Sequence, residues 1–373
     1  MAGAAAPAPP SPSPSPGTVA EIDVAAMPRG ALERMPKWLI CVPLVCQWLW
    51  LSLRHGSATL PSSANPAITA GGLVGETKCE YFDCMGPLAR AATADYCAVS
   101  PSLRASMQQV RHAMTQAGLA FPVIVKPDLG MCGFGVRLIV DEPALAAYFA
   151  AFPPEQTVVL QTWLPQEGEA GIFYARQPGV ARGRITGMAL RYFPRVVGDG
   201  ASTIAELIAA DPRAQRVQGR TDHDFKLDLE WVPPAGQEVR LSTIGSTRVG
   251  GLYRDGSAHV TDSLVAAIDA IANDMTEFYF GRFDIRFTTL DALREGRGFM
   301  IMEVNGAGSE AIQAWDPDIR LIDAFRMIFS KQRALFAIAA LNRSRGHRPI
   351  GLRRLARLHV MQQRLLDAYP PSN

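Results

Sequence analysis

The sequence has no excess of charge of either sign. Its 373 residues carry a formal net charge of +2, and only 19% of them are charged. Proteins that bind nucleic acid usually present a strongly basic surface. The composition therefore predicts no nucleic-acid partner.

Cysteine and histidine are too sparse for a metal-centred or cross-linked fold. The six cysteines include no Cys-x-x-Cys pair, and no histidine cluster lies near them. We therefore expect neither a structural zinc site nor a disulfide framework. Reduced, partly buried thiols in a reducing compartment are the favoured interpretation, which predicts a cytoplasmic protein.

Two common nucleotide-binding motifs are absent as well. No Gly-Lys-Ser/Thr sequence precedes a helix, so there is no Walker A loop. The glycine-rich loop of the chain leads into an expected strand, which excludes a dinucleotide-binding fingerprint. No repeat of fixed period recurs. The chain is nevertheless 48% hydrophobic, enough to build a core of about two or three structural units.

The N-terminal part contains two segments of different character. Residues 1–36 begin with Ala, Pro and Ser in close succession, so we expect a disordered tail. Residues 37–55 contain an apolar run, 38–53, that is shorter than the roughly 20 residues of a membrane-spanning helix. A helix at a membrane interface and a helix packed on the protein are equally compatible with it, and a spanning helix is a third alternative.

From residue 56 onward the pattern predicts an α/β protein. Residues 56–118 form a short N-terminal region of turns followed by a helix with apolar residues at helical spacing. Strands and helices alternate over residues 119–312, and residues 313–373 form a helical, basic extension. The expected strands are 123–125, 136–140, 158–161, 183–192 and 299–304.

A lysine and three glycines form the first candidate site. An expected strand ends near Lys126, and a loop with Gly130, Gly133 and Gly135 follows before the next strand. Glycines let the backbone approach a phosphate closely, and an ammonium group balances the phosphate charge. A tight hairpin with a surface lysine would give the same pattern, so the motif alone leaves both interpretations open.

Oxygen donors on two expected strands form the second candidate site. Arg282 and Asp284 lie in one strand, and Glu303 and Asn305 end the next. Alternate residues of a strand share a face, so each pair points to one side of the sheet. Hard oxygen ligands on one face suit Mg²⁺, which shares its remaining coordination with nucleotide phosphates and water.

The order and spacing of these segments resemble those of the ATP-grasp superfamily. The resemblance covers residues 72–312 and is strongest to D-alanine–D-alanine ligases, glutathione synthetases and cyanophycin synthetases. Residues 197–207 resemble a segment that cyanophycin synthetases share with bifunctional glutathione synthetases. The resemblance implies an α/β fold in which two α+β lobes clasp ATP between antiparallel sheets.

The resemblance also implies a role for each matching residue. The implied ATP-binding residues are Lys78, Lys126, Gly133, Gly135, Thr162, Leu164 and Glu169. The lysines and glycines would hold phosphates, the backbone of Thr162 and Leu164 would contact adenine, and Glu169 would bind the ribose. The implied ligands of two Mg²⁺ or Mn²⁺ ions are Asp284, Glu303 and Asn305. Arg282 would stabilise charge on an acyl phosphate and on the tetrahedral intermediate.

Some positions depart from the family pattern. Gln161 stands where many relatives have an acidic residue, and Glu167 is an alternative to Glu169 as the ribose ligand. The usual lysine for the γ-phosphate has no clear counterpart, and Arg220 and Lys226 are the candidates.

The implied activity is that of a ligase that uses Mg-ATP. A carboxylate would attack the γ-phosphate, and an amine would attack the resulting acyl phosphate to give an amide. The substrates are a small-molecule carboxylate and amine that the sequence does not identify, and the sequence sets no oligomeric state. The alternatives are an ATP-binding scaffold or sensor without ligation, and an ATP-grasp kinase that phosphorylates a small molecule.

The apolar run predicts a cellular location. Its tryptophans favour a membrane interface, and Pro43 would kink a helix that lies there. Basic residues flank the run, and residues 343–357 add several arginines that anionic lipids would attract. We therefore expect peripheral association with the inner membrane face through residues 38–53.

Overall fold

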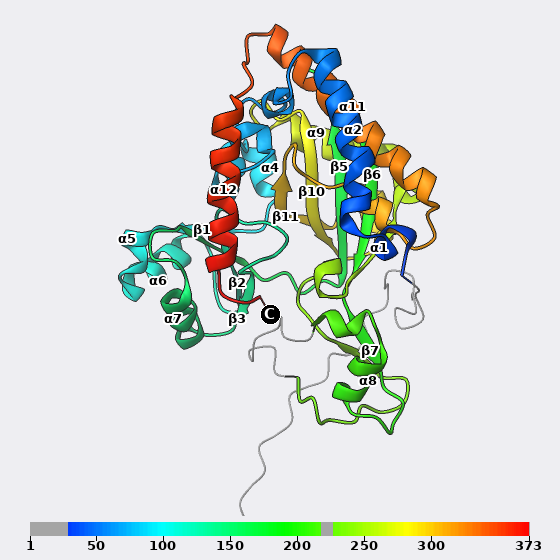
Figure 1. Ribbon diagram of the computed structural model, residues 1–373. Coiled ribbons are helices and arrows are strands. Elements are labelled where there is room, and N and C mark those ends of the chain that lie inside the picture. The colour runs from blue at the N-terminus through cyan, green and yellow to red at the C-terminus, as the bar shows by residue number, and fades with distance from the viewer. Residues whose placement is uncertain (1–28, 218–226, 373) are drawn as a thin grey trace, which may run out of the picture.

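The computed structural model describes residues 29–217 and 227–372, which form two lobes around two antiparallel sheets (Figure 1). Arg220 and Lys226, the candidates for the γ-phosphate, lie outside the described residues, as do residues 1–28 of the expected tail.

The small lobe contains a four-stranded sheet in the order β1-β4-β2-β3. Its strands are β1 (Tyr96–Val99), β2 (Val123–Pro127), β3 (Arg137–Ile139) and β4 (Val158–Thr162). Their apolar side chains form a core with helices α6 (Met107–Gln116) and α7 (Glu142–Ala151). The sequence predicted a domain boundary at residue 118. This boundary would divide the small sheet, because β1 lies before residue 118 and pairs with β4, which lies after it.

The large lobe contains a five-stranded sheet in the order β11-β10-β5-β6-β9. Its strands are β5 (Gly168–Ala175), β6 (Arg184–Tyr192), β9 (Leu252–Asp255), β10 (Phe280–Phe287) and β11 (Phe299–Asn305). One face is apolar and packs on α9 (Asp262–Asn273) and α3 (Lys78–Asp83) to form the largest core. Because side chains alternate along a strand, the charged residues of β5 and β10 lie on the opposite face.

A smaller unit extends from the large lobe (Figure 1). It consists of the antiparallel pair β7–β8 and α8, which enclose a separate apolar cluster. The bounds are β7 (Arg195–Val197), α8 (Ile204–Ala210) and β8 (Glu238–Arg240).

Short helices connect and cover these sheets. The short α-helices are α1 (Ala31–Arg34), α4 (Pro87–Ala91), α5 (Pro101–Arg104) and α10 (Leu290–Arg294). The 3₁₀ turns are η2 (Leu60–Ser63), η3 (Thr69–Gly72), η4 (Ala214–Val217), η5 (Thr247–Val249), η6 (Ser257–His259) and η7 (Ile312–Trp315). The long C-terminal helices are α11 (Leu321–Ser344), which packs on the large lobe, and α12 (Leu352–Ala368), whose last turn packs on the small lobe.

The apolar run near the N-terminus forms one helix, α2 (Lys37–His55), beside α11. Within residues 29–217 and 227–372, no helix has both the length and the hydropathy needed to cross a bilayer.

The expectation of disorder does not hold for residues 29–36, because they contain α1. In α1, Leu32 is buried and Glu33 forms an ion pair of 2.7 Å with Arg213.

The five expected strands are confirmed, with ends shifted by one or two residues. The pattern of β-branched and apolar residues was sufficient to place them, because each is buried on at least one face. All six cysteines are free thiols.

Asn65 connects the N-terminal region to the large sheet by hydrogen bonds, and replacing it tests whether this contact stabilises the fold. Its buried amide Nδ2 donates to the carbonyls of Gly71 and Phe280, and its Oδ1 accepts from the backbone N–H groups of Tyr279 and Phe280. Asn65→Ala would leave these groups buried without partners. It should lower the free energy of unfolding by about 2–4 kcal/mol in urea titrations. The control Asn273→Ala, on the exposed side of α9, should change it by less than about 0.5 kcal/mol.

Candidate active site

Lys126 connects the two sheets of the molecule. It lies near the end of β2, and its buried ammonium Nζ donates to Gln161 Oε1 at 2.6 Å and to the Met302 carbonyl at 2.9 Å. Gln161 belongs to the small sheet and Met302 to the large one. Burial lowers the pKa of Lys126 to about 8. The ammonium is therefore mostly charged at neutral pH and lies where the two lobes meet.

Lys78 approaches the same place from α3. The Thr77 hydroxyl caps the helix by accepting from Glu80 N–H, and the buried Lys78 Nζ lies 3.3 Å from Glu303 Oε1. A Cβ atom added to Gly130 would lie 3.3 Å from that Nζ, so the ammonium rests against the glycine loop. The structure thus brings Lys78, the glycine loop and Glu303 together, and Lys126 is close enough to interact electrostatically with Lys78 and Glu303.

The glycine loop between β2 and β3 has a backbone that favours glycine. Gly133 and Gly135 have φ angles of +73° and +70°, a region that residues with a Cβ atom rarely adopt. Arg248 closes over the loop from η5: its Nε donates to the Cys132 carbonyl at 3.1 Å, and its guanidinium lies 4.6 Å from the centre of the Phe134 ring. The loop is therefore held between the two lobes.

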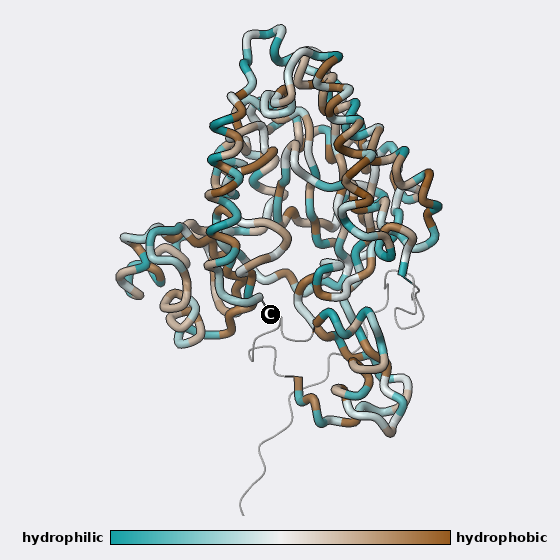
Figure 2. The backbone as a smooth tube through the Cα atoms, in the orientation of Figure 1, coloured by the Kyte–Doolittle hydropathy of each residue, from teal (hydrophilic) through white to brown (hydrophobic). Residues whose placement is uncertain are grey.

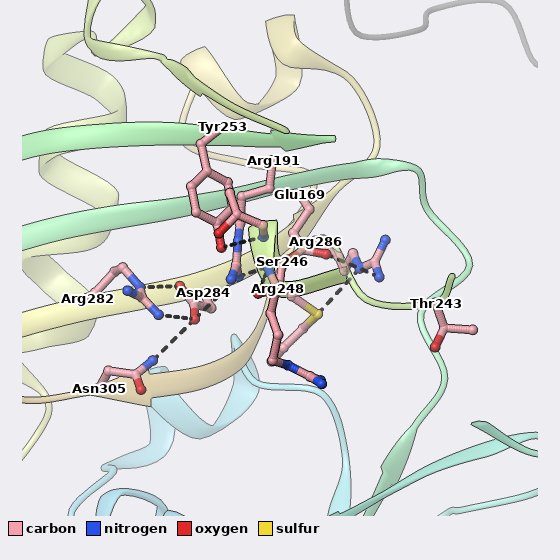
Figure 3. Close-up of polar contacts among 12 residues, drawn as sticks. Glu169, Arg191, Thr243, Ser246, Arg248, Tyr253, Arg282, Asp284, Arg286 and Asn305 are labelled. Carbon is pink, nitrogen blue, oxygen red and sulfur yellow. Dashed lines mark hydrogen bonds and ion pairs between the residues drawn. The ribbon is translucent and has the colours of Figure 1, made fainter. Parts of the chain in front are cut away.

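Arg282 and Asp284 form a buried fork on the charged face of the large sheet (Figure 3). The Nε and Nη2 atoms of Arg282 donate to the two oxygens of Asp284 at 2.6 and 2.7 Å. Asn305 lies opposite Arg282 on β11 and donates to Asp284 from Nδ2 at 3.2 Å. Burial alone would raise the pKa of Asp284, but the guanidinium groups of Arg282 and Arg191 hold it below its usual value.

The three expected Mg²⁺ ligands differ in how many oxygen atoms they have free to bind an ion. Glu303 lies opposite Asp284 and remains about one-third exposed, with Lys78 as its ion-pair partner. Asn305 uses its Nδ2 for Asp284, which leaves its carbonyl Oδ1 as an acceptor. One carboxylate and one amide oxygen suit an ion that also takes phosphates and water. Both oxygens of Asp284 already accept from Arg282, so its clearest role is to orient Arg282 and Asn305.

Glu169 lies within the charged face and is fully paired there. Its carboxylate lies 2.9 Å from Arg191 Nη1 and 3.3 Å from Arg286 Nη2. Arg191 also lies 3.5 Å from Asp284, so it links the two carboxylates, and its guanidinium faces the Tyr253 ring (Figure 3). Glu167, the alternative ribose ligand, instead pairs with arginines of the β7–β8 unit.

The hinge between the sheets positions Thr162 and Leu164. Thr162 ends β4, and its backbone N–H already donates to the Asp95 carbonyl at 2.9 Å. Leu164 lies in the extended connection to β5. The N–H of Thr162 is therefore already used within the protein.

Three residues of this region received no role from the sequence, although the strand alternation already put Arg286 on the face of Arg282 and Asp284. Arg191 and Arg286 lie on buried strands, where a charged residue is costly without a partner, and that signal is present in the sequence. Glu76 lies next to Lys78, has one buried carboxylate oxygen without a hydrogen-bond partner, and has a pKa raised by burial. No pattern could have revealed Glu76, because its burial depends on contacts distant in sequence.

The site as a whole carries excess positive charge. Its cations are Arg191, Arg282, Arg286, Lys78 and Lys126, and its carboxylates are Glu169, Asp284 and Glu303. Among these eight side chains, five cations against three carboxylates leave a surplus of two positive charges. Within the described part of the chain, no group of three or more His, Cys, Asp and Glu side chains is arranged to hold a metal by itself. An anionic ligand is therefore the expected occupant, with any metal shared between it and the protein.

No protein-family model and no curated protein sequence matches the chain. Among solved structures, the bifunctional glutathione synthetase from Pasteurella multocida is 17% identical over 72% of this chain and 38% of that chain, with a TM-score of 0.36. D-alanine–D-alanine ligase from Bacillus anthracis is 14% identical over 71% of this chain and 66% of that chain, with a TM-score of 0.37.

A third match is the D-cycloserine synthetase DcsG, which is 15% identical over 70% of each chain, with a TM-score of 0.39. These matched proteins are ATP-grasp enzymes, and sequence identity to each of them is low. The chain covers less than two-thirds of the length of the glutathione synthetase and of the D-alanine–D-alanine ligase.

The pKa of Lys126 can be measured directly because the chain contains only five lysines. In protein labelled with ¹³C-lysine, the Cε resonance of Lys126 should titrate with a midpoint near pH 8, because burial disfavours the ammonium form. Burial also lowers the pKa of Lys331 to about 8, so two such resonances are expected. Lys126→Met should remove one and Lys331→Met the other. The absence of any lysine resonance that titrates below pH 9 would contradict the buried position of Lys126.

Proposed function

We propose that this chain is an ATP-grasp enzyme that uses Mg-ATP to activate a carboxylate and joins it to an amine. The observation that carries the proposal is that two buried ammonium groups from different elements lie at the junction of the lobes. Lys78 lies against the glycine loop and Glu303, and Lys126 donates to the Met302 carbonyl of the adjoining strand. A tight hairpin with a surface lysine, the alternative interpretation of the sequence, would not bury both ammonium groups. The order of the sequence motifs supports the same function.

The two lysines are the proposed ligands of the ATP phosphates. Each has a single ammonium group in a buried position, where an interaction with phosphate is much stronger than in water. Lys126 donates to Gln161 and Met302, so its position is fixed before a ligand binds. The glycine loop beside Lys78 lets the backbone approach the phosphates. Leu164 would contact adenine, and Glu169 would reach the ribose only by exchanging one of its arginine partners.

Arg282 is the proposed stabiliser of the reacting groups. Asp284 holds it in a fixed fork, so no reorientation is needed when negative charge develops. The carboxylate oxygen of the substrate would form a bond to the γ-phosphorus while the bond to ADP breaks, which gives an acyl phosphate. The amine would then attack the carbonyl carbon, and phosphate would leave as the amide forms. The surplus of positive charge stabilises both steps.

Glu303 and the Oδ1 atom of Asn305 are the proposed protein ligands of Mg²⁺, with Mn²⁺ as an alternative. The bound ion would neutralise phosphate charge during transfer. Lys78, which pairs with Glu303, would then orient this carboxylate and contact the same phosphates.

The metal assignment predicts a specific effect of Glu303→Gln. The variant should keep its fold, because Glu303 is partly exposed and makes no core contact, but it should lose most turnover. In calorimetric titrations, Mg²⁺ should no longer strengthen its binding of ATP. The control Glu295→Gln, at an exposed turn, should behave like the original protein. Normal ATP consumption by Glu303→Gln would rule out this assignment.

The phosphate assignment predicts a loss of nucleotide affinity. Lys126→Ala should weaken ATP binding by about 1.5–3 kcal/mol, roughly 10- to 150-fold in Kd, the scale of hydrogen bonds to a charged group. Gly133→Val should have a similar effect, because its φ of +73° is strained for valine. Lys37→Ala, on the distant helix α2, serves as control. Unchanged affinity in both site variants would exclude this phosphate site.

The reaction class can be separated from its alternatives by product mass. Incubation with ATP, Mg²⁺ and mixtures of small carboxylic acids and amines should give phosphate together with an amide. A phosphate ester would instead identify a kinase, and ATP binding without any product from a broad mixture would favour a scaffold or sensor.

A further inference from the structure

A continuous apolar surface runs along α2 on the side that faces away from the protein. We call this surface the outer face of α2. Every exposed side chain between Lys37 and Arg54 is apolar or a cysteine. The large apolar members are Trp38, Leu39, Val42, Val45, Leu49, Trp50 and Leu53, and their exposed fractions range from 41% to 84%. Figure 2 shows hydrophobic residues along most of this helix. A soluble surface rarely leaves so many neighbouring large apolar side chains uncovered.

The opposite side of α2 is fixed to the protein. Ile40 and Leu51 are buried, and the Trp48 ring packs edge-on against Phe336 of α11 at 5.0 Å between ring centres. The Gln47 amide Nε2 donates to the Phe329 carbonyl at 2.8 Å. The helix therefore lies along α11 (Figure 1), and only its outer face is available to a partner.

Unpaired cations stand at both ends of the outer face. Arg34 and Lys37 are exposed near its start, and Arg54 and Arg343 are exposed near its end, where Arg343 donates to the His55 carbonyl. None of these four has a carboxylate within 4.0 Å among the residues that the structure describes. The guanidinium of Arg54 lies 5.7 Å from the centre of the Trp50 ring.

The cations at the two ends of the outer face indicate whether its partner is a second copy of the chain or a lipid surface. The two ends of the face are about 25 Å apart, the length of 17 helical steps. If two copies packed their outer faces together, either orientation would place cations of one copy beside cations of the other. Glu33, the acidic residue nearest to Lys37 in sequence within the described part of the chain, is buried and paired with Arg213 and Arg216. Self-association would thus juxtapose like charges without compensation.

An anionic bilayer complements both features of the surface. The apolar side chains would enter the region of the acyl chains, and the cations at each end would meet lipid phosphates. Tryptophans near both ends suit the boundary between these regions. We propose that the outer face of α2 docks on an anionic lipid bilayer, with the helix axis parallel to the membrane surface. This inference does not depend on the proposed enzymatic function.

Co-sedimentation of the full-length chain with lipid vesicles tests the docking. With vesicles of phosphatidylcholine and phosphatidylglycerol in equal amounts, the protein should pellet, and high salt should release part of it. The variant Val42→Ser/Val45→Ser/Leu49→Ser should show a partition coefficient reduced at least about tenfold, because it removes exposed apolar surface only. The matched control Val360→Ser/Met361→Ser alters comparably exposed apolar residues of α12 and should bind as the original protein does.

A charge variant and tryptophan quenching complete the test. Lys37→Gln/Arg54→Gln should lose binding to the anionic vesicles while retaining the fold. Vesicles with brominated acyl chains should quench tryptophan fluorescence, and Trp38→Phe/Trp50→Phe should abolish most of this quenching while binding persists. The proposal is wrong if the original protein stays in the supernatant with anionic vesicles at low salt. It is also wrong if light scattering shows a dimer that the triple serine variant converts to a monomer, since the face would then bind a second copy.

Discussion

A sheet face with five charged side chains can be buried only if those charges pair with one another. Strands β5, β6 and β10 place two carboxylates and three arginines on one side of the large sheet. An isolated charge in such a position would cost several kcal/mol, and a complete network avoids that cost. The pairing therefore requires the strand order of this sheet. β5 must lie between β10 and β6 so that Glu169 can reach Arg286 and Arg191.

The need to pair these buried charges also determines which side chains of the candidate site remain free to bind a ligand. Asp284 is committed to Arg282, and Glu169 to two arginines, so both carboxylates orient cations more than they present free oxygens. Glu303 and Asn305, on the outermost strand β11, are less enclosed and keep coordination capacity. The roles implied by the family resemblance are thus not equally supported. Lys78, the glycine loop and Glu303 lie together, and Lys126 lies at the junction of the two lobes. Asp284 and Glu169, in contrast, lie in positions that favour support of other residues.

Helix α2 packs on the protein with one side and exposes apolar side chains on the other. The apolar composition of residues 38–53 was compatible with a core helix and with an interfacial helix. In the structure the helix is packed on α11 by its inner side, yet its outer face stays exposed. The structure therefore confirms the packed helix for the inner side, and the interfacial interpretation stays a prediction for the outer face.

The sequence by itself determined the local elements and the residue types of the site. β-branched runs placed the strands, and the alternation along 281–286 correctly put Arg282 and Asp284 on one face, because both properties depend only on neighbouring residues. Tertiary structure alone decided which charges meet. The partners of Arg191, the burial of Glu76 and the link from Lys126 to Met302 could not be predicted, since burial and pairing arise between segments far apart in the chain. For the same reason only the fold could show which side of α2 is covered.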